Sequence, residues 1–208
     1  MRINIIYHNN GAGLTVDANI IESVLSEHAV NKIDIYKRSK HLKADLNIYL
    51  EVVDYRCFRL APRNVFIPNP EWFMNAWKRT IRKFDCVWCK THDAVKIFKG
   101  MGLPTEYLSF TSPDRYMPGV MRDPVYLHLQ GQSETKGTKQ ILRAWTRDMP
   151  RLIIVSQKRL KVPDYIMHHF GRLGNEAVKK LQNRCLYHLC PSEYEGFGHC
   201  PNQKRINY

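Results

Sequence analysis

The segment Cys190–Gly198 (CPSEYEGFG) directly follows a short apolar run, Leu186 to Leu189, that is typical of a buried β-strand. In a parallel sheet covered by helices on both faces, the carboxyl ends of the strands border the ligand crevice. Glycines at such a place let a ligand approach the backbone, and free amides can bind its oxygen atoms. The segment therefore predicts an α/β sheet with a binding site at its carboxyl edge. A simple strand-to-helix turn that bears an exposed carboxylate is the alternative.

The same alternation of strands and helices extends back through the second half of the chain. Short β-branched runs predict strands at Val125 to Leu129, Leu152 to Val155 and Tyr165 to His169. Apolar residues at helical spacing predict helices from Lys136 to about Arg147 and from Asn175 to Arg184. This pattern is typical of βα units around a mostly parallel sheet.

The first half repeats the pattern. A strand, a glycine loop and a helix open the chain, and Thr15 fits the N-cap of that helix. A second helix is expected from about His92 to Met101. Strands are expected at Ile3 to Tyr7, Lys32 to Tyr36, Leu46 to Glu51, Asn64 to Ile67, Cys86 to Cys89 and Glu106 to Phe110.

A stretch rich in Pro, Gly and Ser, Thr111 to Gly119, is typical of a linker. We therefore expect an N-terminal Rossmann-like domain at residues 1–119 and a C-terminal domain at residues 120–208. Two α/β units in tandem indicate a two-domain protein with a cleft between its halves.

A second polar segment, Gly131–Lys139 (GQSETKGTK), lies between a predicted strand and the helix after it. Lys136 would bring a positive charge to the backbone donors at a helix start, and this combination suits a diphosphate. The spacing is not that of a Walker A loop. An exposed lysine with no ligand is the alternative.

Together, the two polar segments resemble the donor-binding half of retaining glycosyltransferases of the GT-B fold, the large family 4 class. The shared order is a strand, Gly-x-x-x-x-Lys-Gly, a helix, the segment Phe170–Leu173, another helix, and a strand that leads into Pro-Ser-x-x-Glu-Gly-Phe-Gly. The match covers about Val125 to His199, and the first half agrees only in pattern. The resemblance implies an α/β protein of two Rossmann-like domains facing a cleft.

The resemblance also implies roles for individual residues. Lys136 would neutralise the donor diphosphate, and Glu195 would hold hydroxyls of the transferred sugar; these two are the expected catalytic residues. The expected donor-binding residues are Gly11, Gly13, Gln132, Ser133, Lys136, Arg172, Glu195, Gly196, Phe197 and Gly198. Asn69 and Glu71, after a predicted strand, would lie on the acceptor side.

The chain departs from the family pattern in three places. Gln132 stands where the family usually has Arg or Lys, and Gln203 stands where a second Glu is common. The chain also ends at Tyr208, where the family continues through a further helix and strands. We therefore expect a truncated second domain, a homo-oligomer that covers it, weak donor binding and slow turnover.

The chain is strongly basic, with a formal net charge of +13 and a pI near 9.6. Such a charge attracts an anionic donor, a nucleic acid or an anionic membrane surface alike. Six cysteines in a chain of this size are expected to be reduced thiols. Zinc ligation by Cys86 and Cys89, or by His188 to Cys200, is a weaker alternative, because no second C-x-x-C completes a site. No apolar run is long enough to span a membrane, so we expect a soluble cytoplasmic protein.

These observations favour a hexosyltransferase that uses a UDP-sugar or GDP-sugar, needs no metal, and acts on a glycan, a protein or a nucleic acid. Two alternatives stay open. The first is a catalytically silent GT-B-like protein that binds a nucleotide or a partner. The second is a nucleic-acid-binding or DNA-modifying protein that uses its basic surface.

Overall fold

The structure is a computed structural model and describes residues 1–193 and 197–199. The chain divides into two compact units, Met1–Thr111 and Ser112–Tyr208. The border lies at the start of the Pro/Gly/Ser-rich stretch. Each unit is built on a sheet of parallel strands with helices packed on it, so the expected α/β class with parallel sheets is confirmed. No helix in the described part of the chain is both long and apolar enough to cross a membrane.

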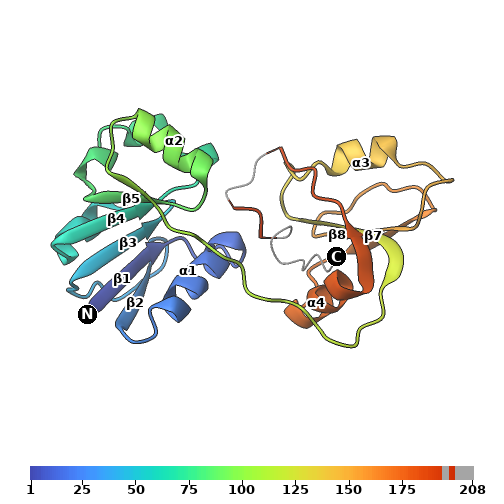
Figure 1. The fold of residues 1–208 in the computed structure, drawn as a ribbon, viewed down its shortest axis with the longest axis horizontal. Helices are drawn as coiled ribbons and strands as arrows, with labels where there is room; N and C mark the ends of the chain where they lie inside the picture. Colours follow the sequence, from blue (N-terminus) through green and yellow to red (C-terminus); the bar gives the residue numbers. More distant parts are fainter. Residues whose placement is uncertain (194–196, 200–208) are drawn as a thin grey trace. The chain divides into compact units, whose positions relative to one another are not determined.

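The first unit holds a six-stranded sheet in the order β2-β1-β3-β4-β5-β6, and every neighbouring pair is parallel (Figure 1). Its strands are β1 Arg2–Tyr7, β2 Ala29–Asp34, β3 Leu46–Leu50, β4 Arg63–Ile67, β5 Cys86–Cys89 and β6 Thr105–Tyr107. Its helices are α1 Gly13–Val24, α2 His92–Gly100, and the short 3-10 turns η1 Tyr55–Leu60, η2 Pro70–Trp72, η3 Asn75–Trp77 and η4 Ile81–Lys83.

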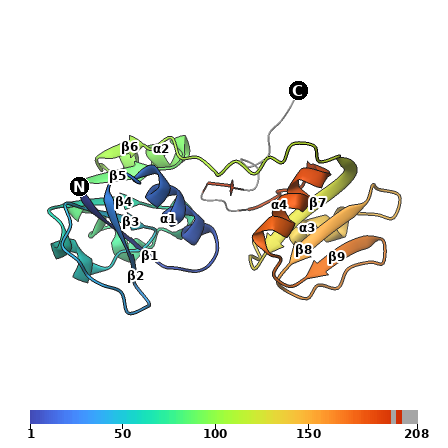
Figure 2. The same ribbon diagram turned by 90° about the horizontal axis from the view of Figure 1, so that it is seen from below.

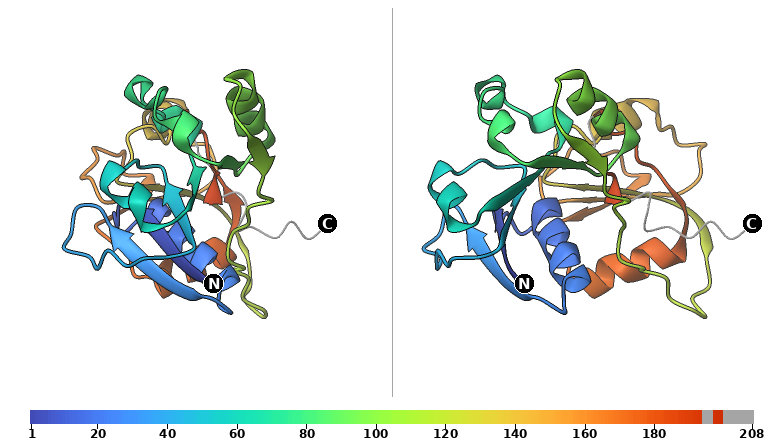
Figure 3. Two further views of the ribbon diagram at one scale, coloured as in Figure 1. Left: turned by 90° about the vertical axis from the view of Figure 1, so that its left-hand side faces the viewer. Right: turned by 60° about the vertical axis from the view of Figure 1, so that its left-hand side comes forward.

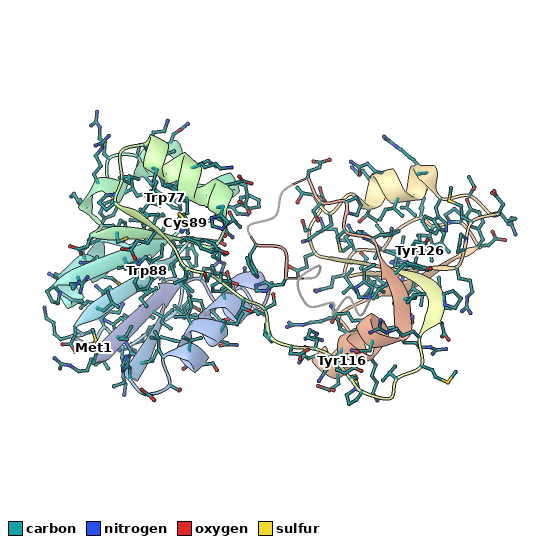
Figure 4. All side chains as sticks on the ribbon, in the orientation of Figure 1. Met1, Trp77, Trp88, Cys89, Tyr116 and Tyr126 are labelled. Carbon is teal, nitrogen blue, oxygen red and sulfur yellow. The ribbon has the colours of Figure 1, made fainter. Side chains whose placement is uncertain are left out.

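Two cores cover the two faces of this sheet. Successive residues of a strand point to opposite faces, so Ile5 packs in the core under α1, whereas Ile6 packs in the core under α2 and the 3-10 turns. Figure 4 labels Trp77, which packs against the α2 core, and Trp88, which packs against the α1 core. Burial on both faces is typical of the strands of a parallel sheet.

A row of asparagines crosses the first sheet from β2 to β4. The amide of Asn31 donates to Asn4 Oδ1 at 2.9 Å, Asn4 donates to Asn47 Oδ1 at 2.9 Å, and Asn47 donates to Asn64 Oδ1 at 2.8 Å. The same residues face each other in the strand register. Asn47 also donates to the carbonyl of Cys57 at 2.9 Å, so this buried polar row is internally satisfied.

The second unit holds a four-stranded parallel sheet in the order β10-β7-β8-β9. Its strands are β7 Asp123–Gly131, β8 Leu152–Ser156, β9 Ile166–Phe170 and β10 Cys185–His188, and its helices are α3 Thr138–Ala144 and α4 Asn175–Arg184. Apolar residues of α3 and α4 pack in separate cores on the two faces of the sheet, and Figure 2 shows both helices against it. Figure 3 gives two further views of the same ribbon.

Several expected boundaries are wrong. The helix α1 starts at Gly13 with Ala12 as its N-cap, because the hydroxyl of Thr15 is used inside the preceding loop rather than at the cap. The helix α3 is shorter than expected: Gly137 before it has a left-handed φ of 71°, and Trp145 after it is extended. The expected strand from Glu106 to Phe110 is also displaced, because the pairing of β6 with β5 ends at Tyr107.

Candidate functional site

The strand order of the second sheet creates a topological switch point. The chain runs from β7 to β8 and β9 on one side and then returns to place β10 on the other side of β7. The loops that leave β7 and β10 therefore lie next to each other at the carboxyl edge, beside the switch point, where open α/β sheets bind their ligands. The two loops are the two polar segments that the sequence singles out, Gly131–Lys139 and Cys190–Gly198.

The structure brings these two segments into direct contact. A Cβ built on Gly137 would lie 2.8 Å from Cγ of Pro191 and closer still to its carbonyl oxygen, so only glycine fits there. The N–H of Glu193 donates to the carbonyl of Thr135 at 2.9 Å, and the amide of Gln140 donates to Glu193 Oε1 at 2.9 Å. Backbone-to-backbone packing thus fixes the two loops against each other.

A buried histidine in β7 contacts the chain at one end of each of these two loops. His128 in β7 is 1% exposed; its Nδ1 lies 2.9 Å from the carbonyl of Leu189, and its Nε2 lies 2.8 Å from Oγ1 of Thr138. A carbonyl can only accept, so Nδ1 carries the proton, and the hydroxyl of Thr138 donates to Nε2. Burial lowers the pKa of His128, and the positive charge of Lys136 lowers it further, so the neutral ring is favoured.

Beside the β7 loop lies a pocket of about 240 Å³ at the carboxyl ends of β7, β8 and β9. Its lining is Leu129, Gln130, Gly131, Val155, Gln157, Gly171, Arg172, Leu173 and Val178. Gln130 is 6% exposed, and its Oε1 has no hydrogen-bond partner within the described residues. A buried acceptor of this kind is costly unless a donor reaches it.

The expected donor-side residues fall into three groups. Lys136 is half-buried, and its charge reaches His128. The other polar residues of its loop contact neighbours, since Gln132 donates to Gln157 Oε1 at 2.9 Å and the hydroxyl of Ser133 lies 2.9 Å from that of Thr135. The third group is the β10 loop: Phe197 and Gly198 are described, whereas Glu195, Gly196 and Gln203 lie outside the described residues.

No protein-family model matches this chain, and no curated protein matches it. The chemistry of the site must therefore be argued from its own geometry. The first unit contributes the other expected residues, and it has a switch point of its own.

In the first sheet the switch point lies between β1 and β3, since β2 lies on one side of β1 and β3 to β6 lie on the other. The loop after β1 contains the expected Gly11 and Gly13. The N–H of Gly11 donates to Oγ1 of Thr15 at 2.8 Å, and the N–H of Ala12 donates to Asn10 Oδ1 at 2.9 Å. Both amides are engaged inside the loop, so binding a phosphate through them would require the loop to rearrange.

The loops after β3 and β4 bring polar groups together. The amide of Asn69 donates to Oε1 of Glu51, and the negative charge of Glu71 is close enough to raise the pKa of Glu51. The main cause of that raised pKa, to about 7, is burial; the positive charge of Lys90 opposes it. Lys90 is itself buried and forms an ion pair with Asp17 at 2.7 Å. The expected Asn69 and Glu71 therefore lie in a larger charged cluster.

Sequence reasoning does not single out Asp17, Glu51 or Lys90. Two signals point to them. Asp17 lies among the apolar residues of an amphipathic helix, and both Glu51 and Lys90 directly follow buried strands. A polar residue at the carboxyl end of a buried strand, like the glycines after β10, indicates the edge of the sheet where ligands bind.

The expected reduced thiols are compatible with the structure. Cys57, Cys86, Cys89, Cys185 and Cys190 form no disulfide. Within the described ranges no group of His, Cys, Asp and Glu could hold a metal ion. In the C-x-x-C of β5, the cysteines are three positions apart along a strand and so point to opposite faces. Burial also raises the pKa of Cys89 to about 11, which disfavours the thiolate that a metal needs.

Proposed function

We propose that the second unit binds the nucleoside diphosphate part of a sugar nucleotide and that the protein is a glycosyltransferase of the GT-B type. One observation carries the proposal: the β7 and β10 loops pack against each other through Gly137 and Pro191 at the switch point of a parallel sheet. Such a fixed pair of loops with a lysine beside them is suited to an anionic ligand.

The proposed ligand matches the groups at this edge. Lys136 would lie at the diphosphate, and the guanidinium of Arg172, which lines the pocket, adds a second positive charge. The nucleoside would enter the pocket of about 240 Å³. A UDP-sugar or a GDP-sugar carries both parts, a diphosphate and a nucleoside.

The proposed chemistry is transfer of a hexose with retention of configuration. As the bond from the sugar to the diphosphate breaks, negative charge builds on the leaving phosphate, and positioned cations stabilise that charge. Lys136 would supply this stabilisation without a metal. Glu195 and the amides of Gly196, Phe197 and Gly198 would hold the sugar, a role that stays a prediction from the resemblance. The acceptor is a glycan, a protein or a nucleic acid.

The decisive experiment compares nucleotide binding by two lysine variants. Lys136→Ala should lose about 1.5 to 3 kcal/mol of affinity for UDP-sugars or GDP-sugars, the size of a charge-assisted contact. Lys139→Ala is the matched control, since Lys139 lies three positions further on and is exposed, whereas Lys136 is half-buried. Calorimetry measures the affinity. Bound ligand should also raise the free energy of unfolding, by about 2.7 kcal/mol at a ligand concentration of about 100 times the Kd, and thermal unfolding measures this rise.

Equal affinity in wild type, Lys136→Ala and Lys139→Ala would refute the diphosphate site. A donor that binds but is never turned over, tested across glycan, protein and nucleic-acid acceptors, would leave a silent nucleotide-binding protein in place of the transferase.

A further inference from the structure

The second unit contains another pocket, of about 130 Å³, on the face of the sheet that α4 covers. This amino-end pocket lies at the amino ends of β7, β8 and β9 beside the last turn of α4, and its lining includes Val125, Ile153, Met167 and Arg184. The pocket of the proposed function lies at the carboxyl ends of the same strands. The amino-end pocket is therefore a separate site, and the proposed function assigns no role to it.

The inner wall of the amino-end pocket is apolar. Val125 and Ile153 are buried and pack in one core with Leu181 of α4. Met167 pairs with Ile153 in the strand register but is 44% exposed, since no described residue of β9 belongs to that core. A cavity of about 150 Å³ can hold a benzene molecule, so the pocket suits an apolar group of about that size.

The rim of the amino-end pocket is positively charged. Nε of Arg184 donates to Oδ2 of Asp123 at 2.6 Å, so these two charges largely neutralise each other. Arg151 also lines the pocket; it is exposed and forms no ion pair within the part of the chain that the structure describes. His169 lines the same pocket and contributes a ring N–H donor. One guanidinium and one imidazole are thus available to a ligand.

These groups select the charge of the ligand. A guanidinium binds a carboxylate or a phosphate through charge-assisted hydrogen bonds. A single guanidinium matches the one negative charge of a carboxylate, whereas a phosphate monoester brings about 1.5 to 2 negative charges. The carboxyl end of α4 adds a partial negative charge of about half a unit, which Arg151 outweighs but which disfavours a more highly charged anion. The rim therefore favours a monocarboxylate.

We propose that the amino-end pocket binds a small organic anion in which an apolar body of about six carbon atoms carries one carboxylate. The apolar body lies against Val125, Ile153 and Met167, and the carboxylate accepts hydrogen bonds from the guanidinium of Arg151 and the ring of His169. This inference goes beyond the proposed function and does not depend on it.

The test follows the methyl signal of Met167 by NMR on the full chain, labelled with ¹³C at the methionine methyl groups. Loss of one signal in Met167→Leu identifies it. Benzoate and hexanoate are the probes; benzyl alcohol and hexanol have similar bodies without the charge, and acetate has the charge without the body. We expect benzoate or hexanoate to shift the signal saturably, with an affinity about tenfold higher than that of the controls, because a charge-assisted contact adds to the apolar one.

Two arginine variants test the source of the charge. Arg151→Gln should lower the affinity for benzoate about tenfold, to that of benzyl alcohol. Arg143→Gln is the matched control and should leave the affinity unchanged, because Arg143 is also exposed but belongs to α3, which packs on the other face of the sheet. Lys136→Ala should leave it unchanged as well, so a failure of the proposed diphosphate site is distinguishable from a failure of this inference.

Three results would overturn the inference. The first is no saturable shift of the Met167 signal with either benzoate or hexanoate. The second is equal affinity for these probes and for the uncharged alcohols or acetate, which would show that the pocket does not combine an apolar wall with a cationic rim. The third is the same affinity for benzoate in Arg151→Gln and Arg143→Gln.

Discussion

The backbone of Gly137 packs against Pro191 with no room for a side chain between them. These residues belong to loops that leave β7 and β10, more than fifty positions apart in the sequence. Their contact fixes the β7 loop against the β10 loop, because any atom added to Gly137 displaces Pro191.

Gly137→Ala should destabilise the second unit by about 2 to 5 kcal/mol, since it combines a strained left-handed backbone with a clash against Pro191. Gly131→Ala is the matched control: its φ is 61°, but a Cβ there would meet nothing within 4 Å. The control should cost about 1 kcal/mol. Urea unfolding followed by tryptophan fluorescence reports on this unit in a background in which Trp72, Trp77 and Trp88 of the first unit are replaced by Phe, which leaves Trp145. Equal losses in the two variants would contradict the packing argument.

The lowered pKa of His128 predicts that the second unit becomes less stable at acid pH. Its pKa is lowered in the folded state, so the unfolded chain binds more protons. The contribution of the neutral His128 ring to the free energy of unfolding is therefore fully present above the pKa of the unfolded chain, about 6.5. It is lost as the pH falls towards the lower pKa of the folded state. His128→Gln keeps an amide donor and acceptor but cannot titrate. In urea unfolding across pH, wild type should lose more stability below about pH 6.5 than His128→Gln; parallel curves would show that His128 contributes nothing.

The ion pair of Lys90 and Asp17 predicts that substitutions of these two residues have non-additive effects on the free energy of unfolding. Both side chains are buried and the ion pair measures 2.7 Å, so Lys90→Met should cost about 3 to 5 kcal/mol by leaving the Asp17 charge without this cation. The double variant Lys90→Met, Asp17→Leu should recover much of that loss. Chemical unfolding of the single and double variants measures the coupling. A double variant as unstable as the sum of both singles would show that the two charges do not interact.

The sequence predicts the second sheet better than the site in the first unit, and the reason is physical. Buried strands and amphipathic helices carry their period in the residue order, so helix α4 and strand β5 lie where the pattern predicts them. The contact of Gly137 with Pro191 depends on strand order instead. Glu51 could not be predicted for a different reason, because a single carboxyl after a strand forms no periodic pattern in the sequence. Its raised pKa arises only in the folded unit, where it is buried near α1, β5 and η2.

The asparagine row gives a prediction for the first unit. Asn47→Leu removes hydrogen bonds to Asn4, Asn64 and the carbonyl of Cys57, and it should destabilise this unit by about 2 to 5 kcal/mol. Asn31→Ala, at the edge of the same row, should cost about 1 kcal/mol. Thermal unfolding compares the two. A Leu variant as stable as the Ala variant would show that the row does not hold the strands in register.

The end of that row also affects how the protein behaves at high concentration. Rows of asparagine amides can extend from one molecule to the next, as they do in stacked cross-β fibrils. Here Asn31 gives one amide proton to Asn4 and the other to the carbonyl of Lys40 in its own chain. Both N–H donors of Asn31 are therefore engaged inside its own chain, and a strand from a second molecule at the outer edge of β2 would have to supply the donor itself. The row therefore has a direction, and only an asparagine that donates to Oδ1 of Asn31 would lengthen it across a molecular boundary.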